Sequence, residues 1–225
     1  MKWIQVLVLV GLVSLTNGCG SEAPKTETPV AAAAVKETNP NNDAAIEAAK
    51  ANPLEGIVGA YQKAYEAKSY RAQLVSTRED ISGITKCEFV APDRYRLSTG
   101  PTEIIAVGDA TFLKTLGSWQ RVADGLPNQL KSVRDTQMVE KMRAANNVKF
   151  VQADTLNGEA MLVYECTTSN LLGTEGITYA KTWVSIAEGL PRKAEFEGMI
   201  GSVKTRGVMT WFDYNADIKI EPPIK

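Results

Sequence analysis

The feature that most constrains the fold of this sequence is a β-strand pattern that recurs from residue 69 to residue 213. Stretches rich in Val, Ile, Thr and aromatic residues alternate with turn-forming residues. The strongest turn signal is Asn157-Gly158, since both central positions of a type I′ turn need a positive φ. Turns this short join antiparallel neighbours, because parallel strands need long crossovers. The predicted strands cover residues 69–80, 84–91, 93–99, 102–108, 110–116, 119–123, 148–156, 159–168, 177–187, 191–199 and 202–213.

A first helix is expected just before these strands. Asn52 is a good N-cap, Pro53 falls at the first helical position, and Glu55 falls where a capping box places it. Apolar residues then recur every three or four positions as far as Tyr65, which is the pattern of one buried helix face.

A second helix is predicted from about residue 128 to 145, between two groups of strands. Met138 and Met142 lie on its apolar side. Flexible methionines suit a surface that adapts to variable ligands, whereas the alternative is ordinary core packing.

The predicted elements favour a mainly β fold of the α+β class. A sheet of about ten or eleven strands must curl or close, and two helices cannot cover both of its faces. We therefore expect a strongly curved antiparallel sheet, or incomplete β-barrel, with the helices covering its concave face.

The N-terminus has the pattern of a secretory signal peptide over residues 1–18. Lys2 precedes an apolar run over residues 3–15. A helix of that length reaches roughly 20 Å, too short for a bilayer core of roughly 30 Å. Leu15 to Cys19 resembles the lipobox of bacterial lipoproteins, which implies that Cys19 is lipidated; the alternative is ordinary cleavage beside an incidental cysteine. Gly20, in place of Asp, resembles an outer-membrane signal of a Gram-negative cell.

The segment after Cys19 has the composition of a tether. It is made of Ala, Pro, Thr, Glu, Lys and Asn, and it lacks Phe, Tyr and Trp. Such a segment cannot bury enough apolar surface to offset the entropy of ordering it. We assign residues 19–50 to the lipidated cysteine and a flexible linker, with order beginning near Asp43, and residues 51–225 to the folded domain.

Composition and motifs argue against several functions. The formal net charge is -1, which gives no electrostatic footprint for nucleic acid. The chain has no histidine, the commonest general acid or base, and no phosphate loop, zinc-protease or nucleophile-elbow motif. Glu195 and Glu197 share one face of a predicted strand, but their alternation with apolar residues indicates a solvent-facing row. We expect a protein that is not an enzyme, with no catalytic residue, metal or cofactor.

Two cysteines, Cys87 and Cys166, remain after Cys19. In an oxidising compartment they invite a disulfide. The alternative is two buried free thiols on strands too far apart to meet.

Four segments together resemble the LolA-like and LppX-like envelope lipoproteins, in the same order along the chain. They extend from about residue 50 to the end. The segments are VAPDRYR at 90–96, EIIAVGDATFLK at 103–114 followed by WQR at 119–121, WVS at 183–185 with GLPRK at 189–193, and FDYNADIKIEPP at 212–223.

This resemblance implies an incomplete β-barrel in which helices cap an apolar cavity that binds acyl chains of lipids or lipoproteins. It implies no catalytic residues. Because this chain carries its own lipidation signal, the resemblance favours an anchored LppX-like or LolB-like role over a free carrier.

The expected function is therefore a lipid-anchored envelope protein, facing the periplasm from the outer membrane, that binds lipid or lipoprotein acyl chains and serves their transport. The partners are lipid, the membrane through the anchor, and another envelope lipoprotein. The alternative is a protein-interaction or envelope-sensing module on the same fold. The residues proposed to line the cavity, each of which has a filled core as its alternative, are Leu74, Phe89, Tyr95, Ile105, Phe112, Trp119, Met138, Met142, Leu162, Tyr164, Trp183, Phe196, Met209 and Trp211.

Overall fold

The structure is a computed structural model that describes residues 40–79, 81–122, 143, 147–167, 177–200 and 202–224. The described residues form the helices α2 (Pro40–Ala51) and α3 (Pro53–Glu66). The strands are β1 (Ser69–Arg78), β2 (Ile81–Val90), β3 (Arg94–Thr99), β4 (Thr102–Val107), β5 (Ala110–Thr115), β6 (Ser118–Val122), β7 (Asn147–Leu156), β8 (Glu159–Thr167), β9 (Ile177–Ser185), β10 (Pro191–Ile200) and β11 (Val203–Phe212).

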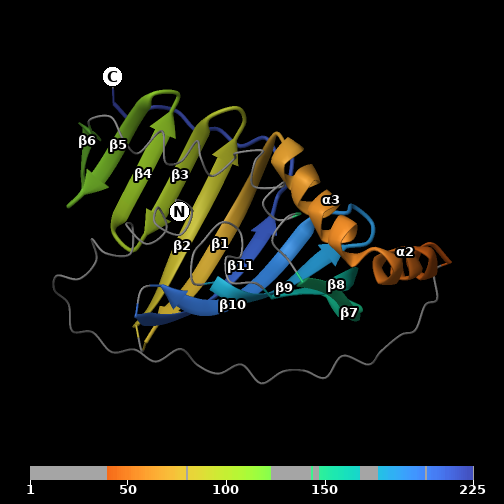
Figure 1. Cartoon of the computed structure of the whole chain (residues 1–225). Coiled ribbons are helices and arrows are strands. Elements are labelled where there is room, and N and C mark those ends of the chain that lie inside the picture. The colour runs from red at the N-terminus through yellow and green to blue at the C-terminus, as the bar shows by residue number, and fades with distance from the viewer. Residues whose placement is uncertain are drawn as a thin grey trace.

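These strands pair into one antiparallel sheet in the order β6-β5-β4-β3-β2-β1-β11-β10-β9-β8-β7. Two meanders, β1 to β6 and β7 to β11, meet where β1 pairs with β11. In the described part of the chain, β6 and β7 are the edges, so the sheet is open. Figure 1 shows how strongly it twists and curves between them. The predicted fold class is confirmed to this extent.

The strand predictions are confirmed, with ends displaced by at most a few residues. Asn157 and Gly158 have φ values of 53° and 83°, as their turn requires. The strand pattern is readable because most of the strands are separated by residues with a clear turn preference, such as Asn157-Gly158.

Helix α3 packs on one side of the sheet, over its β7–β11 half (Figure 1). Ile57, Val58 and Ala60 are buried against residues of β8 and β9, and the partly buried Tyr61 and Tyr65 pack beside them. We call this side of the sheet the helix-side face and the other the opposite face.

The expected capping box does not form. Asn52 lies at the N-cap of α3 but makes no side-chain cap hydrogen bond. Its backbone N–H donates to Ala48 O of α2, at 3.0 Å. Glu55 instead pairs with Arg143, at 3.0 Å. The physical reason is that Asn52 joins two successive helices, so its backbone takes a conformation set by both.

The folded domain begins before residue 51, which corrects the predicted boundary. Helix α2 occupies residues that we assigned to the linker, and Ala49 is buried in the core beneath it. The alanines of α2 supply enough small apolar surface to dock it beside α3, although their average hydropathy resembles that of a tether.

The predicted helix over residues 128–145 lies outside the described residues, as do Met138 and Met142. Arg143 alone of this segment is described; it is helical and pairs with Glu55.

The C-terminal tail packs on the opposite face. After β11 it crosses the start of β1, where Ser69 Oγ donates to Ala216 O at 2.6 Å. Ile218 and Ile220 are then buried against Ile105 and Phe112 of β4 and β5. This tail shields an apolar part of the sheet that α2 and α3 do not reach.

Gly56 is expected to be irreplaceable for the docking of α3. A Cβ at Gly56 would lie 2.5 Å from the hydroxyl oxygen of the buried Tyr164. Gly56→Ala should destabilise the fold by about 1–3 kcal/mol, because α3 must move off the sheet. Gly59→Ala is the matched control, since a Cβ there meets nothing within 4 Å. It should stabilise the helix by up to about 1 kcal/mol. Urea unfolding checks both; equal effects would contradict the packing argument.

Candidate functional site

The pairing register divides the side chains of the sheet between its two faces. Residues directly opposite each other on paired strands point to the same side. Leu74 pairs with Met209, Met209 with Ala194, Ala194 with Thr182, and Thr182 with Tyr164. Tyr164 packs against α3, so this whole row lies on the helix-side face.

The helix-side face is almost free of charge. On β1–β5, β8, β9 and β11, the helix-side positions that the register defines carry a single charged side chain, Arg78. The other positions hold apolar residues, glycine, serine, threonine and cysteine. An uncharged face that crosses so many strands is suited to hydrocarbon, because burial of a charge without a partner is costly.

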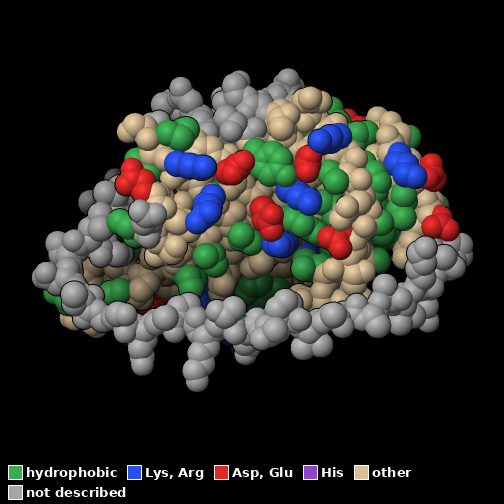
Figure 2. Space-filling view, turned by 90° about the horizontal axis from the view of Figure 1, so that it is seen from below, with side chains coloured by type: hydrophobic (Ala, Val, Ile, Leu, Met, Phe, Trp, Pro, Cys, Tyr) green, Lys and Arg blue, Asp and Glu red, His purple; other side chains and the backbone are tan. Residues whose placement is uncertain are grey.

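The opposite face carries the charges. Glu88 accepts from Arg71 and Arg96, both at 2.7 Å, and Glu103 pairs with Arg96 at 3.5 Å and with Lys114 at 3.7 Å. Surface pairs of this kind are worth about 0–1 kcal/mol each, so they keep this face soluble more than they stabilise it. Figure 2, seen from below, shows basic and acidic side chains interspersed.

Most of the predicted cavity residues that the structure describes lie together on the helix-side face. The alternation and register place there Leu74, Phe89, Tyr95, Leu162, Tyr164, Phe196, Met209 and Trp211.

Four predicted cavity residues lie on the opposite face, apart from the others. Ile105 and Phe112 pack under the C-terminal tail, with Trp119 partly buried beside them. Trp183 is buried with Met161 and Val163. Its indole N–H donates to Asp154 at 2.9 Å, and Lys193 Nζ is 4.4 Å from the ring centroid. Each of these four residues is next in sequence to a residue that points to the helix-side face.

The helix-side face also holds residues that the sequence analysis did not select. Leu97 and Ile104 are buried with Phe89, Tyr95 and Ala106 in one cluster. The available signal was the two-residue period: Leu97 and Ile104 are in phase with Tyr95 and Ala106, whereas Ile105 is not.

Aromatic rings line two parts of the helix-side face. The centroids of Phe89 and Tyr95 are 5.1 Å apart, and those of Phe89 and Tyr70 are 5.2 Å apart. Nearer to α3, Tyr61 meets Trp211 edge-on at 6.2 Å. Burial raises the pKa of the Tyr61 hydroxyl to about 12, so Tyr61 is neutral here and adds no charge to the face.

Two threonines on this face pair their hydroxyls with each other. Thr85 and Thr99 are buried cross-strand partners whose hydroxyl oxygens lie 2.8 Å apart. Thr102 continues the row on β4, where it pairs with Thr99. This row gives the face a neutral polar strip. Thr111, on β5 of the same face, differs, because its buried hydroxyl has no hydrogen-bond partner within the described residues.

Cys87 and Cys166 are free thiols, so the disulfide alternative is wrong. Cys87 is on β2 and Cys166 on β8, and β1, β11, β10 and β9 lie between those strands. Five strand spacings separate them by roughly 24 Å, whereas a disulfide needs Cα atoms within about 7 Å.

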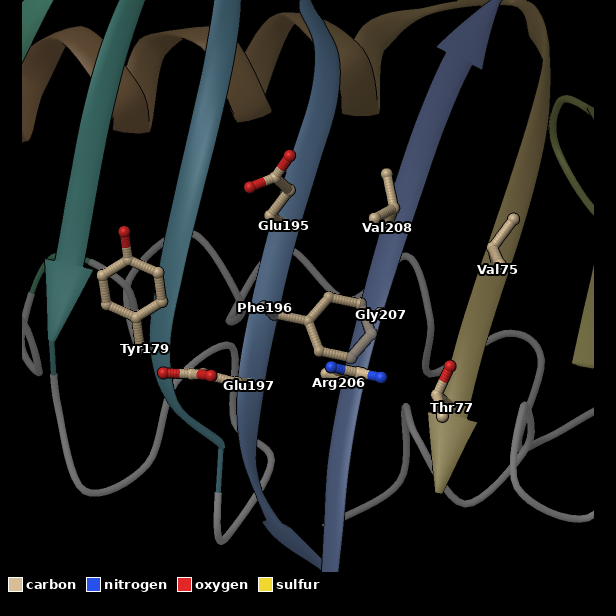
Figure 3. Close-up of a pocket in the computed structure, with 9 residues that line it drawn as sticks. All are labelled: Val75, Thr77, Tyr179, Glu195, Phe196, Glu197, Arg206, Gly207 and Val208. Carbon is tan, nitrogen blue, oxygen red and sulfur yellow. The ribbon is translucent and has the colours of Figure 1, made fainter. Parts of the chain in front are cut away.

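A hollow of about 280 Å³ lies on the opposite face, across β9, β10, β11 and β1. In Figure 3 a helix lies behind these strands, Glu197 extends toward Tyr179, and Arg206 extends toward Thr77. Glu195 on the rim pairs with Lys193 at 2.6 Å. The residues that line the hollow are Val75, Thr77, Tyr179, Glu195, Phe196, Glu197, Arg206, Gly207 and Val208.

The described residues contain no group of three or more His, Cys, Asp or Glu side chains placed to hold a metal ion. Within them, neither helix has both the length and the apolar character needed to span a bilayer.

These features define a protein built on an open antiparallel sheet with one apolar and one charged face. No protein-family model matches the sequence, and no curated protein matches it. Among solved structures, the Mycobacterium tuberculosis lipoprotein LppX is similar, with a TM-score of 0.56 and 14% identity over 80% of this chain and 100% of that chain. LprF from Mycobacterium bovis has a TM-score of 0.53 and 13% identity over 77% and 98%. The LppX-like resemblance is thus confirmed as a likeness of fold.

The half-buried thiol of Cys87 and the buried thiol of Cys166 should both be unreactive in the folded protein. Burial raises the pKa of Cys87 and of Cys166 to about 12 each, from 9.0, and the thiolate is the reactive form. With Cys19→Ser, we expect both thiols to react with a disulfide reagent at pH 8 more than tenfold slower than in the unfolded chain.

The same shifts set a pH dependence. Above pH 9 the unfolded chain loses its thiol protons while the folded chain keeps them, so stability should fall as the pH rises from 9 toward 12. Urea midpoints at pH 8 and pH 10 check this sign. Thiols that react rapidly in the folded protein, together with a urea midpoint that is the same at pH 8 and pH 10, would contradict the raised pKa values.

Proposed function

We propose that this protein is a lipid-anchored envelope protein that binds acyl chains of lipids or lipoproteins on the helix-side face of its sheet. The observation that carries the proposal is the near absence of charge on that face, whereas the opposite face carries the ion pairs of Glu88 and Glu103. We infer that the helix-side face is the concave one and that it serves lipid or lipoprotein transport.

The energetics favour such a ligand. Moving an acyl chain of about 16 carbons from water to an apolar surface is worth roughly 12 kcal/mol, at about 0.8 kcal/mol per CH₂. Leu74, Met209 and Trp211 supply that surface beside α3 and need no charged partner. Met209 and Trp211 are only partly buried, so they have surface left to offer to a ligand.

The proposed address rests on the N-terminus and on the fold. Residues 1–18 have the signal-peptide pattern, Cys19 ends a lipobox-like segment, and residues up to α2 form the proposed tether. LppX, which has the same fold, is a lipoprotein. We propose attachment to the outer membrane, facing the periplasm, and no catalytic role.

Ligand binding should depend on which face a substitution alters. Met209→Lys places a charge on the helix-side face, and Val208→Lys places the same charge on the opposite face of the same strand. Met209→Lys should weaken binding of a fluorescent fatty acid at least tenfold, whereas Val208→Lys should change it less than twofold. Titration of the chain from Cys19 onward, produced without acylation, measures both.

A milder variant controls for unfolding. Met209→Gln introduces polarity without charge, and its thermal unfolding is compared with that of Val208→Gln. Native mass spectrometry of the unaltered protein should show co-purified lipid. Protein that carries no lipid and takes up no fatty acid would contradict acyl binding.

Lipidation is tested separately. Cells fed an alkyne-tagged palmitate should label the unaltered protein and Cys87→Ala, which keeps the N-terminal cysteine. Cys19→Ala should lose the label and the membrane association. Label retained in Cys19→Ala would refute the anchor and leave acyl binding intact.

A second candidate function is a protein-interaction module. The hollow on the opposite face favours it, because Val75 on its rim and the neighbouring Ile84 are 37% and 53% exposed. Capture of one specific partner that Ile84→Glu abolishes, from protein free of lipid, would support this candidate over the first.

A further inference from the structure

Arg78 is the one charge on the helix-side face of β1, and it lies at the end of the strand farthest from α3. It pairs with Thr205 on β11 and with Ile81 on β2. Trp211, which α3 contacts through Tyr61, is six residues from Thr205 along β11, or roughly 20 Å. The apolar face therefore has one basic end.

Within the described residues, the guanidinium of Arg78 forms no ion pair with a carboxylate. Glu79 follows it in the turn, where the Glu79 backbone N–H donates to Lys204 O. The side chains of Lys204 and Arg206 both lie on the opposite face. The side chain of Arg78 is half-buried, which strengthens its interaction with an anion relative to open water.

Polar but uncharged groups surround the same end of the face. Ser76 precedes Arg78 on the same side of β1, and Thr205 opposite is only 2% exposed. Between these groups and α3 lie Leu74 and Met209. Along β1, starting from the end near α3, the side chains of the helix-side face are thus first aromatic, then aliphatic, then hydroxyl-bearing and finally cationic.

We propose that Arg78 binds the anionic head group of an acyl lipid whose hydrocarbon tail lies along the helix-side face toward Trp211. This inference rests on the proposed acyl binding and adds the class of ligand: a lipid with a carboxylate or phosphate head. A guanidinium suits both heads, because its paired N–H donors match two oxygens of either group.

The test compares two probes with the same tail. cis-Parinaric acid carries a carboxylate, and its methyl ester is neutral. Arg78→Gln should weaken binding of the acid about tenfold and leave the ester within twofold. Arg206→Gln is the matched control on the opposite face and should change neither. Arg78→Lys keeps the charge and should recover most of the affinity for the acid. Thermal unfolding of the three variants shows that each is folded.

Displacement of the probe by palmitate or by lysophosphatidic acid then tells a carboxylate head from a phosphate head, and either result supports an anionic ligand. The proposal is overturned if Arg78→Gln binds the acid as well as the unaltered protein does, or if it weakens acid and ester equally. In both cases the unaltered protein still binds lipid, so acyl binding stands. If the unaltered protein binds neither probe, both proposals fail.

Discussion

The structure depends on one physical constraint: successive residues of a strand point to opposite faces, and a charge without a partner is costly to bury. Applied across paired strands, this constraint separates the side chains into an uncharged face and a charged one. Arg71 and Glu88 lie opposite each other on the charged face, while their neighbours Ala72 and Cys87 lie opposite each other on the other. A single sheet can therefore be soluble on one side and suited to hydrocarbon on the other.

Element positions were predictable from the sequence because their signals are local. Strand ends coincide with turn residues, and the apolar face of α3 follows from a spacing of three and four. Which face each residue points to was harder to predict, because a continuous apolar run such as 104–107 shows no alternation between apolar and polar residues. Only the register with β3 shows that Ile104 lies under the helix side and Ile105 on the other.

The opposite face misled the sequence analysis for a second reason, which is the C-terminal tail. Ile218 and Ile220 belong to no strand, and nothing in their local pattern says that they cover Ile105 and Phe112. Buried apolar residues on this side therefore look like cavity residues. Long-range contacts of this kind cannot be predicted from the spacing of apolar residues. The same is true of the position of Arg78 at the end of the helix-side face.

The joining of β1 to β11 has a consequence for how the chain is made. The first strand of the sheet finds one of its two neighbours only in the last, and the contacts that join the two meanders are almost as distant in sequence as the domain allows. Such pairings form slowly, because a long loop must close before any contact is gained. A chain synthesised from its N-terminus therefore keeps its two meanders unjoined until β11 is available. Until then β1 and β10 each expose an unpaired edge, and such an edge can pair with another chain.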